Sequence, residues 1–105
     1  MGYLGEFELL VMLAILRLRD DAYGVSIRDE LESETSRVLS LGAVYRTLGR
    51  LEAKGSLATR VAPPTAERGG RRRKIYGITA DGLAACRRSV TDLRRMIDGL
   101  EPDLP

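Results

Sequence analysis

The sequence predicts a small, mainly helical α+β domain with three helices, a two-stranded hairpin and a fourth helix. Apolar residues recur at helical spacing in four segments. Two short runs of β-forming residues flank a loop that contains Pro63-Pro64 and Gly69-Gly70. The 105 residues, 44% of them hydrophobic, suffice for one core. These observations favour a single folded domain.

The first helix is expected from about Gly5 to Arg19. Between Phe7 and Leu18 it is apolar on nearly all sides, so it needs cover on more than one face. We therefore expect part of it, including Phe7, Leu10 and Val11, to pack on a second subunit. A central core helix in a monomer is the alternative.

Asp20-Asp21 indicates a break and an N-cap before the second helix. This helix is expected at about Tyr23–Glu34. Ile27 and Leu31, four residues apart, form its buried stripe.

Ser40 is the expected N-cap of the third helix, which runs from Leu41 to about Lys54 and ends before Gly55. Its apolar residues recur at intervals of three and four, which predicts one buried stripe. The opposite face is small and cationic, with residues Ala43, Arg46, Arg50 and Ala53. Such a face can approach a surface closely and offer planar guanidinium groups to it.

Two strands are expected at Leu57–Ala62 and Arg73–Thr79, joined by the loop Pro63–Arg71. Tyr76 and Ile78 are expected to point inward. The loop then projects as a basic hairpin tip.

The last helix is expected from Ala80 to about Leu100, capped by Thr79. Its apolar residues alternate at steps of three and four, namely Leu83, Cys86, Val90, Leu93, Ile97 and Leu100. We expect this stripe to dimerise, although packing on its own domain is the alternative. Cys86 is expected to be a buried thiol and not a redox sensor.

The positive charge is concentrated in the middle of the chain. Residues 41–74 hold nine Lys and Arg against two acidic residues, whereas residues 1–40 hold four against eight and residues 75–105 four against five. The net charge of +2 therefore hides a basic module between two mildly acidic ends, as expected of a nucleic-acid-binding protein.

Composition argues against several other functions. There is no His, so triad chemistry and the usual metal-ligand spacings are absent, and a single Cys cannot form an internal disulfide. The apolar run 7–18 is too short to span a membrane and lacks the flanks of a signal peptide. We expect a cytoplasmic protein that is not an enzyme and needs no cofactor.

Three helices, a hairpin and a further helix form the order of a winged helix-turn-helix domain with an added helix. In such a domain the third helix enters the major groove, where Arg can bond two acceptors of guanine. The hairpin tip contacts phosphates or the minor groove. A winged-helix module for protein–protein interaction, without specific DNA binding, is the alternative.

The chain resembles the PadR family of bacterial transcriptional regulators. The resemblance lies in LGEFELLVMLAIL at 4–16, DAYGVSI at 21–27, SLGAVYRTLGRLEAKG at 40–55 and PPTAERGGRRRKIYGITADG at 63–82. It implies a homodimeric winged-helix repressor with a C-terminal dimerisation helix. It also implies that Tyr45 and the backbone near Ser40–Ala43 lie at the DNA and that Gly69–Arg73 form the wing.

Two features depart from the family pattern. The family often has Pro between the wing arginines, where this chain has Arg72, so we expect a more cationic and less rigid wing. The C-terminal region is short, about one helix. Some members bind aromatic or drug-like molecules, but this chain has no Trp to stack them, and no effector can be named.

The sequence thus predicts a DNA-binding domain at 1-79 and a dimerisation helix with tail at 80-105. The expected partners are double-stranded DNA with a pseudo-palindromic operator and a second copy of the chain. The candidate DNA-binding residues are Ser40, Gly42, Ala43, Tyr45, Arg46, Arg50, Arg68, Gly70, Arg71, Arg72, Arg73 and Lys74. The candidate dimer-interface residues are Phe7, Leu10, Val11, Leu83, Cys86, Val90, Leu93, Ile97 and Leu100.

Overall fold

The computed structural model describes residues 3–63 and 73–105, and within them the elements follow the predicted order. They are α1 (Glu6–Leu18), a short 3₁₀ helix η1 (Arg19–Asp21), α2 (Gly24–Glu34), α3 (Leu41–Ala53), β1 (Leu57–Ala62), β2 (Arg73–Ile78) and α4 (Ala80–Ile97). Most helix ends lie within a residue or two of the prediction. The exception is α4, which ends three residues early, at a turn around Gly99 with positive φ.

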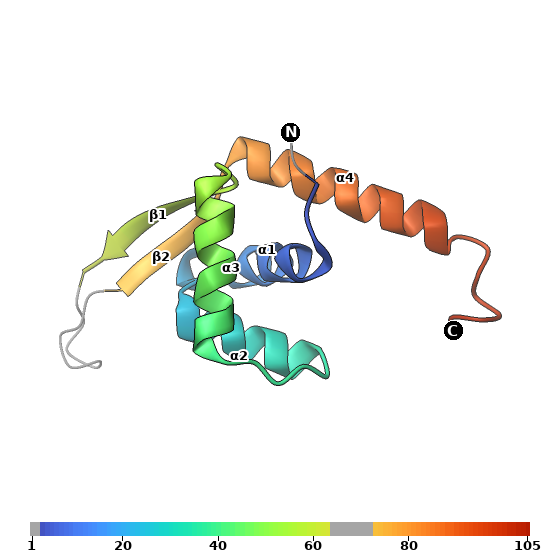
Figure 1. The fold of residues 1–105 in the computed structure, drawn as a ribbon, viewed down its shortest axis with the longest axis horizontal. Coiled ribbons are helices and arrows are strands. Elements are labelled where there is room, and N and C mark those ends of the chain that lie inside the picture. Colours follow the sequence, from blue (N-terminus) through green and yellow to red (C-terminus); the bar gives the residue numbers. More distant parts are fainter. Residues whose placement is uncertain (1–2, 64–72) are drawn as a thin grey trace.

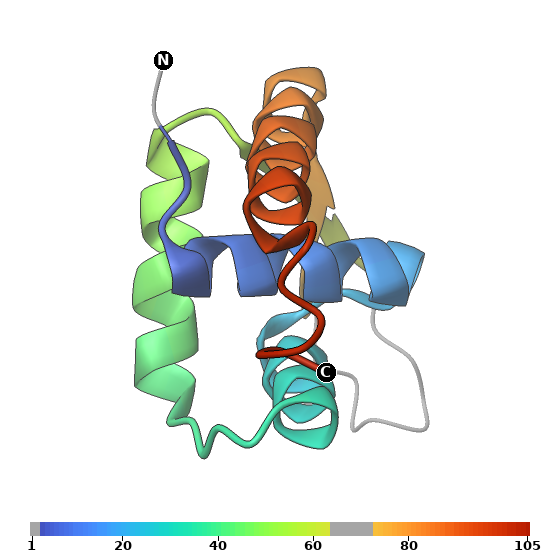
Figure 2. The ribbon, with the colours of Figure 1, turned by 90° about the vertical axis from the view of Figure 1, so that its right-hand side faces the viewer.

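α1 lies in the middle of the molecule, between α4 and α2, and α3 stands across its end (Figures 1 and 2). The hairpin starts at the C-terminal end of α3 and projects to one side of that helix (Figure 1). The core lies where α1, α2 and α3 meet, and its largest fully buried apolar side chains are Val11, Met12, Ile27, Val44, Leu48 and Leu51. Because α1 is covered by helices on opposite sides, much of its all-round apolar surface is buried within one chain.

The predicted N-cap at Asp20-Asp21 is wrong. Arg19–Asp21 form the 3₁₀ turn, and α2 starts after Tyr23, whose N–H donates to Oγ of Ser26 at 3.0 Å. The Ser26 hydroxyl in turn donates to the Asp21 carbonyl at 2.6 Å. A serine inside the first turn therefore satisfies the amide that the aspartates were expected to satisfy.

β1 and β2 pair antiparallel, with Thr59 opposite Tyr76 and Ala62 opposite Arg73. The Tyr76 N–H donates to the Ala22 carbonyl at 2.8 Å, which ties β2 to the segment after α1. Tyr76 is buried in the core, as predicted, and burial raises the pKa of its phenol. The strand ends one residue before Thr79 because the Thr79 hydroxyl caps α4, accepting from the Gly82 N–H at 3.0 Å.

α4 packs on the rest of the chain only as far as Val90. Its buried residues end at Cys86, and residues 91–97 are all exposed. The second half therefore extends beyond the rest of the molecule (Figure 1). With α4 included, the molecule measures 51 × 30 × 21 Å along its principal axes.

Candidate nucleic-acid interface

α3 presents a small, cationic face to solvent. The Ser40 hydroxyl accepts from the Ala43 N–H at 3.1 Å, which confirms the predicted start of the helix. Val44, Leu48 and Leu51 are fully buried, so the opposite face is turned outward. That face carries Gly42, Tyr45, Arg46, Gly49 and Arg50, all exposed.

Of the two arginines on this face, Arg46 has no acidic partner among the described residues. Its side chain lies over the preceding turn: a Cβ added to Gly42 would be 3.4 Å from Nη1 of Arg46. Because residue 42 has no side chain, another surface can approach the helix closely beside the arginine.

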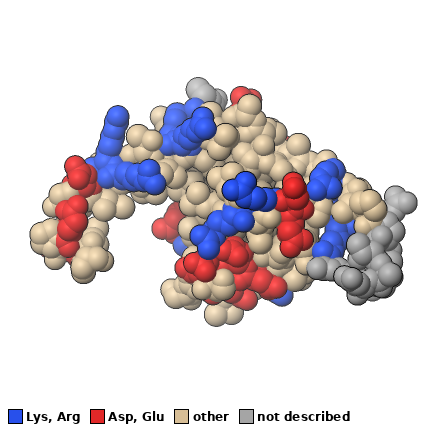
Figure 3. Space-filling view, turned by 180° about the vertical axis from the view of Figure 1, so that it is seen from behind, with Lys and Arg blue, Asp and Glu red and all other residues tan. Residues whose placement is uncertain are grey.

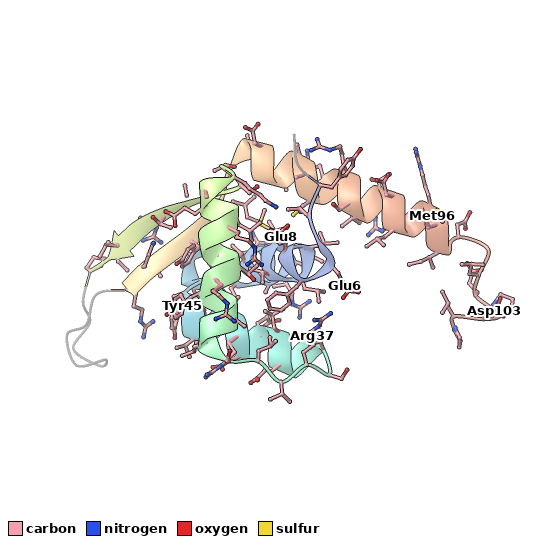
Figure 4. All side chains as sticks on the ribbon, viewed as in Figure 1. Glu6, Glu8, Arg37, Tyr45, Met96 and Asp103 are labelled. Carbon is pink, nitrogen blue, oxygen red and sulfur yellow. The ribbon has the colours of Figure 1, made fainter. Side chains whose placement is uncertain are left out.

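Tyr45 extends from α3 to the first residue of α2. Its phenolic oxygen lies so close to Gly24 that a Cβ there would overlap it, and the side chain is still 48% exposed. The free N–H groups at the start of a helix attract anions. The hydroxyl of Tyr45 lies beside the start of α2 (Figure 4).

Arg50 and Lys54, one turn further along α3, are turned toward α1. Oε1 and Oε2 of Glu8 each accept from Nζ of Lys54 at 2.9 Å, and Oε2 lies 3.7 Å from Nε of Arg50. Arg50 also donates to Oγ1 of Thr47 at 3.0 Å. Arg50, predicted to contact DNA, is thus engaged within the protein, although its side chain is more than half exposed.

Burial opposes ionisation of Glu8, but the hydrogen bonds from Lys54 and Gly5 and the positive charges of Lys54 and Arg50 outweigh it. The pKa of Glu8 therefore lies below its ordinary value. No role was predicted for Glu8 from the sequence. The available signal was a carboxylate within an apolar run, which needs a cationic partner when buried.

At the base of the wing, Arg73 and Lys74 also contact the body of the domain. Arg73 stacks on the ring of Tyr23, 4.1 Å from its centroid. Nζ of Lys74 lies 3.3 Å from Oε1 of Glu52 on α3. The remaining predicted wing contacts lie outside the described residues; they are Arg68, Gly70, Arg71 and Arg72.

The opposite face of the molecule is less suited to a polyanion. There, in the middle of the view, Lys and Arg side chains lie close to Asp and Glu side chains, so the charges partly offset each other (Figure 3). The outward side of α3 and the wing is thus the better candidate for binding nucleic acid.

The predicted dimer residues fall into two groups. Val11 is fully buried in the chain's own core and has no surface for a partner, so its assignment to an interface is corrected. Cys86 is also buried in the chain, and this burial raises the pKa of its thiol. The others are partly or largely exposed, namely Phe7, Leu10, Leu83, Val90, Leu93, Ile97 and Leu100.

Several of the exposed residues line a groove of about 430 Å³ between α1, the α2–α3 connector and the second half of α4. Leu10, Leu13, Val90, Leu93 and Ile97 form its apolar surface. Met96, for which the sequence pattern predicted no role, is 75% exposed on the same half of α4 (Figure 4).

A model of the transcriptional regulator PadR-like family matches residues 12–88. The chain belongs to this family. Membership makes it a PadR-like transcriptional regulator, and the family is one of DNA-binding regulators and not of enzymes. No curated protein shows a significant match to the chain.

Solved structures confirm the predicted winged-helix fold. A PadR family transcription regulator from Clostridium difficile R20291 is 22% identical with a TM-score of 0.74, and the alignment covers 94% of this chain and 99% of the other. A PadR family transcriptional regulator from Eggerthella lenta DSM 2243 is 28% identical with a TM-score of 0.69, covering 94% and 86%. A PadR-like regulator from Bacillus cereus is 20% identical with a TM-score of 0.72, covering 93% and 89%.

Within residues 3–63 and 73–105 there is no group of His, Cys, Asp and Glu that could hold a metal ion. No helix in the same ranges is long and apolar enough to cross a membrane.

Proposed function

We propose that this PadR-like regulator acts in the cytoplasm as a homodimeric repressor that binds a pseudo-palindromic operator. The observation that carries the proposal is the outward face of α3, where Arg46 has no acidic partner among the described residues. Small residues surround Arg46 on this face, and the start of the helix is capped by Ser40. A planar guanidinium on such a face can bond O6 and N7 of guanine in the major groove.

Phosphate contacts are proposed on both sides of α3. Tyr45, next to the start of α2, would donate its hydroxyl to one phosphate. The wing would supply further cations, including Arg71 and Arg72, to the backbone or the minor groove. These contacts would set the register in which Arg46 meets the base edges.

We also propose that residues 1-79 bind DNA and that residues 80-105 dimerise. The support is the second half of α4, whose Leu93 and Ile97 are half exposed beside an apolar groove. Clustered exposed apolar residues of this kind mark protein interfaces. A two-fold dimer would place its two α3 helices in half-sites about one turn, ~34 Å, apart.

The test is a titration of the protein against its own upstream promoter DNA and against a scrambled duplex, at about 50 and 200 mM salt. Tighter, salt-sensitive binding to the promoter with two subunits per site is the expected result, and a promoter–reporter fusion then gives the sign of regulation. Equal binding to both duplexes contradicts specific recognition of this promoter. Failure to bind either duplex would favour the alternative, a winged-helix module that binds a protein partner.

A further inference from the structure

Glu8 differs from the other ion-paired acids of the described chain in its burial and in its number of partners. Its side chain is only 10% exposed. It accepts from Nζ of Lys54 with both oxygens, from the Gly5 N–H at 2.9 Å, and lies 3.7 Å from Nε of Arg50. Figure 4 shows it between α1 and α3, in contrast to Glu6 at the open end of α1.

This arrangement directs two cations of the basic block back toward the protein. Arg50 and Lys54 follow Arg46 along the last two turns of α3. Both side chains are about half exposed, so DNA phosphates could reach them if they were released. Affinity for any DNA sequence rises with each cation that is free to neutralise a phosphate.

The other pairs of acid and cation near this surface are not built in the same way. Lys74 pairs with Glu52 at 3.3 Å, but both side chains are substantially exposed. Arg37 pairs with Glu6, whose side chain is 82% exposed. Exposed pairs exchange partners at little cost, whereas a buried carboxylate holds its partners strongly because leaving it unpaired is costly.

We propose that Glu8 is a specificity-determining residue that acts by positioning: it withholds Arg50 and Lys54 from phosphates and fixes the orientation of α3. Sequence-independent affinity is thereby kept low, while Arg46 remains free to distinguish bases. The role of Arg50 is then to hold the helix and not to read a base. This inference rests on the DNA-binding function proposed above.

The experiment compares Glu8→Gln with Glu6→Gln, which removes the same charge from the same turn of α1. Binding to a scrambled duplex and to the operator is measured between about 50 and 200 mM salt, with thermal unfolding to confirm folding. Raising the salt over this range should weaken binding of Glu8→Gln to the scrambled duplex more than it weakens binding of the wild type. The extra loss of affinity should be about threefold for each cation that is released, and about tenfold if both are released. The operator should gain less affinity than the scrambled duplex, because α3 is no longer held in the orientation in which Arg46 distinguishes bases, so the operator-to-scrambled ratio should fall.

Glu6→Gln should keep the wild-type salt dependence. A merely structural role of Glu8 would lower stability and weaken binding to both duplexes without making the salt dependence steeper. Equal salt dependence of the Glu8→Gln and Glu6→Gln proteins would overturn the inference while leaving the proposed function intact. If the wild-type protein shows no salt-dependent binding to DNA, both the inference and the proposed function are contradicted.

Lys54→Gln supplies a second readout that does not depend on replacing the buried acid. If Lys54 is withheld from DNA, its neutralisation leaves the salt dependence of scrambled-duplex binding unchanged. If Lys54 is an ordinary phosphate contact, the loss of affinity over the same salt range becomes about threefold smaller. The latter result overturns the inference even where Glu8→Gln fails to fold.

Discussion

The phenol of Tyr45 on α3 lies directly against the backbone of Gly24, the first residue of α2. A Cβ at residue 24 would overlap the phenolic oxygen and two carbons of the ring. The position therefore has to be a glycine for the tyrosine to lie where it does. This contact places the hydroxyl beside the start of α2, the site proposed for a phosphate.

Gly24→Ala should displace Tyr45 and weaken operator binding about tenfold, which matches the loss of one hydrogen bond to a charged group. The unfolding free energy should change by less than about 1 kcal/mol, because the displaced atoms are the end of an exposed side chain. Fluorescence anisotropy with operator DNA and a urea melt would measure the two effects. Tyr45→Phe is the matched variant, and wild-type binding by both would exclude the phosphate contact.

Gly82→Ala should destabilise the protein by about 1–3 kcal/mol, because its Cβ would overlap the Ser56 carbonyl oxygen, a backbone atom that cannot swing aside. Gly49→Ala is the control, since its Cβ meets nothing within 4 Å. Because residue 49 lies in the interior of α3, Gly49→Ala should raise the free energy of unfolding by about 0.5–1 kcal/mol. Urea unfolding measures both, and a Gly82→Ala protein as stable as wild type would contradict the close contact.

Local signals explain why much of the fold could be predicted from the sequence. Ser40 and Thr79 cap the helices they were expected to cap, since a hydroxyl before an apolar periodic run has a local partner in the next turn. The β-type runs before and after the Gly-rich loop pair as expected. These features depend on neighbours a few residues apart, which a sequence displays directly.

The wrong N-cap at Asp20-Asp21 is a local error, whereas the misassigned Val11 and the unpredicted pairing of Arg50 involve contacts between distant segments. Val11 is as apolar as Leu10, and only the packing of α1 between other helices decides that Val11 is buried and Leu10 partly exposed. Likewise, the charge of Arg50 is visible in the sequence, but its pairing with Glu8 spans 42 residues and depends on how α3 crosses α1. Periodicity gives the face of a helix and not the partner of that face.

Arg46→Ala should reduce discrimination between operator and scrambled DNA by about 1–3 kcal/mol if Arg46 makes a bidentate base contact. Removing an arginine also lowers the positive charge, which weakens binding to both duplexes. Arg88→Ala, on an exposed position of α4, is the charge-matched control. Competition titrations give the ratio of the two affinities, and an unchanged ratio for Arg46→Ala would exclude this residue from base recognition.

The stabilising effect of Glu8 should depend on pH. Its pKa in the folded protein is depressed, so its contribution is complete above the pKa of the unfolded chain and is lost as pH falls through the lower, folded pKa. Wild type should therefore be more stable than Glu8→Gln near pH 7, and the difference should shrink as pH falls below the ordinary pKa of a glutamate. Urea melts across this range measure it. A constant difference would mean that the carboxylate charge does not contribute.

Leu93→Asp should weaken the proposed dimer at least tenfold, because burying a leucine is worth about 1.5–3 kcal/mol and a carboxylate cannot replace it in an apolar interface. Val38→Asp is the control: Val38 is 94% exposed, more than Leu93 at 50%, but it is not among the residues that line the groove. Sedimentation equilibrium gives the dissociation constant. If Leu93→Asp remains as dimeric as Val38→Asp, the second half of α4 is not the dimer interface, and its exposed apolar residues require another partner.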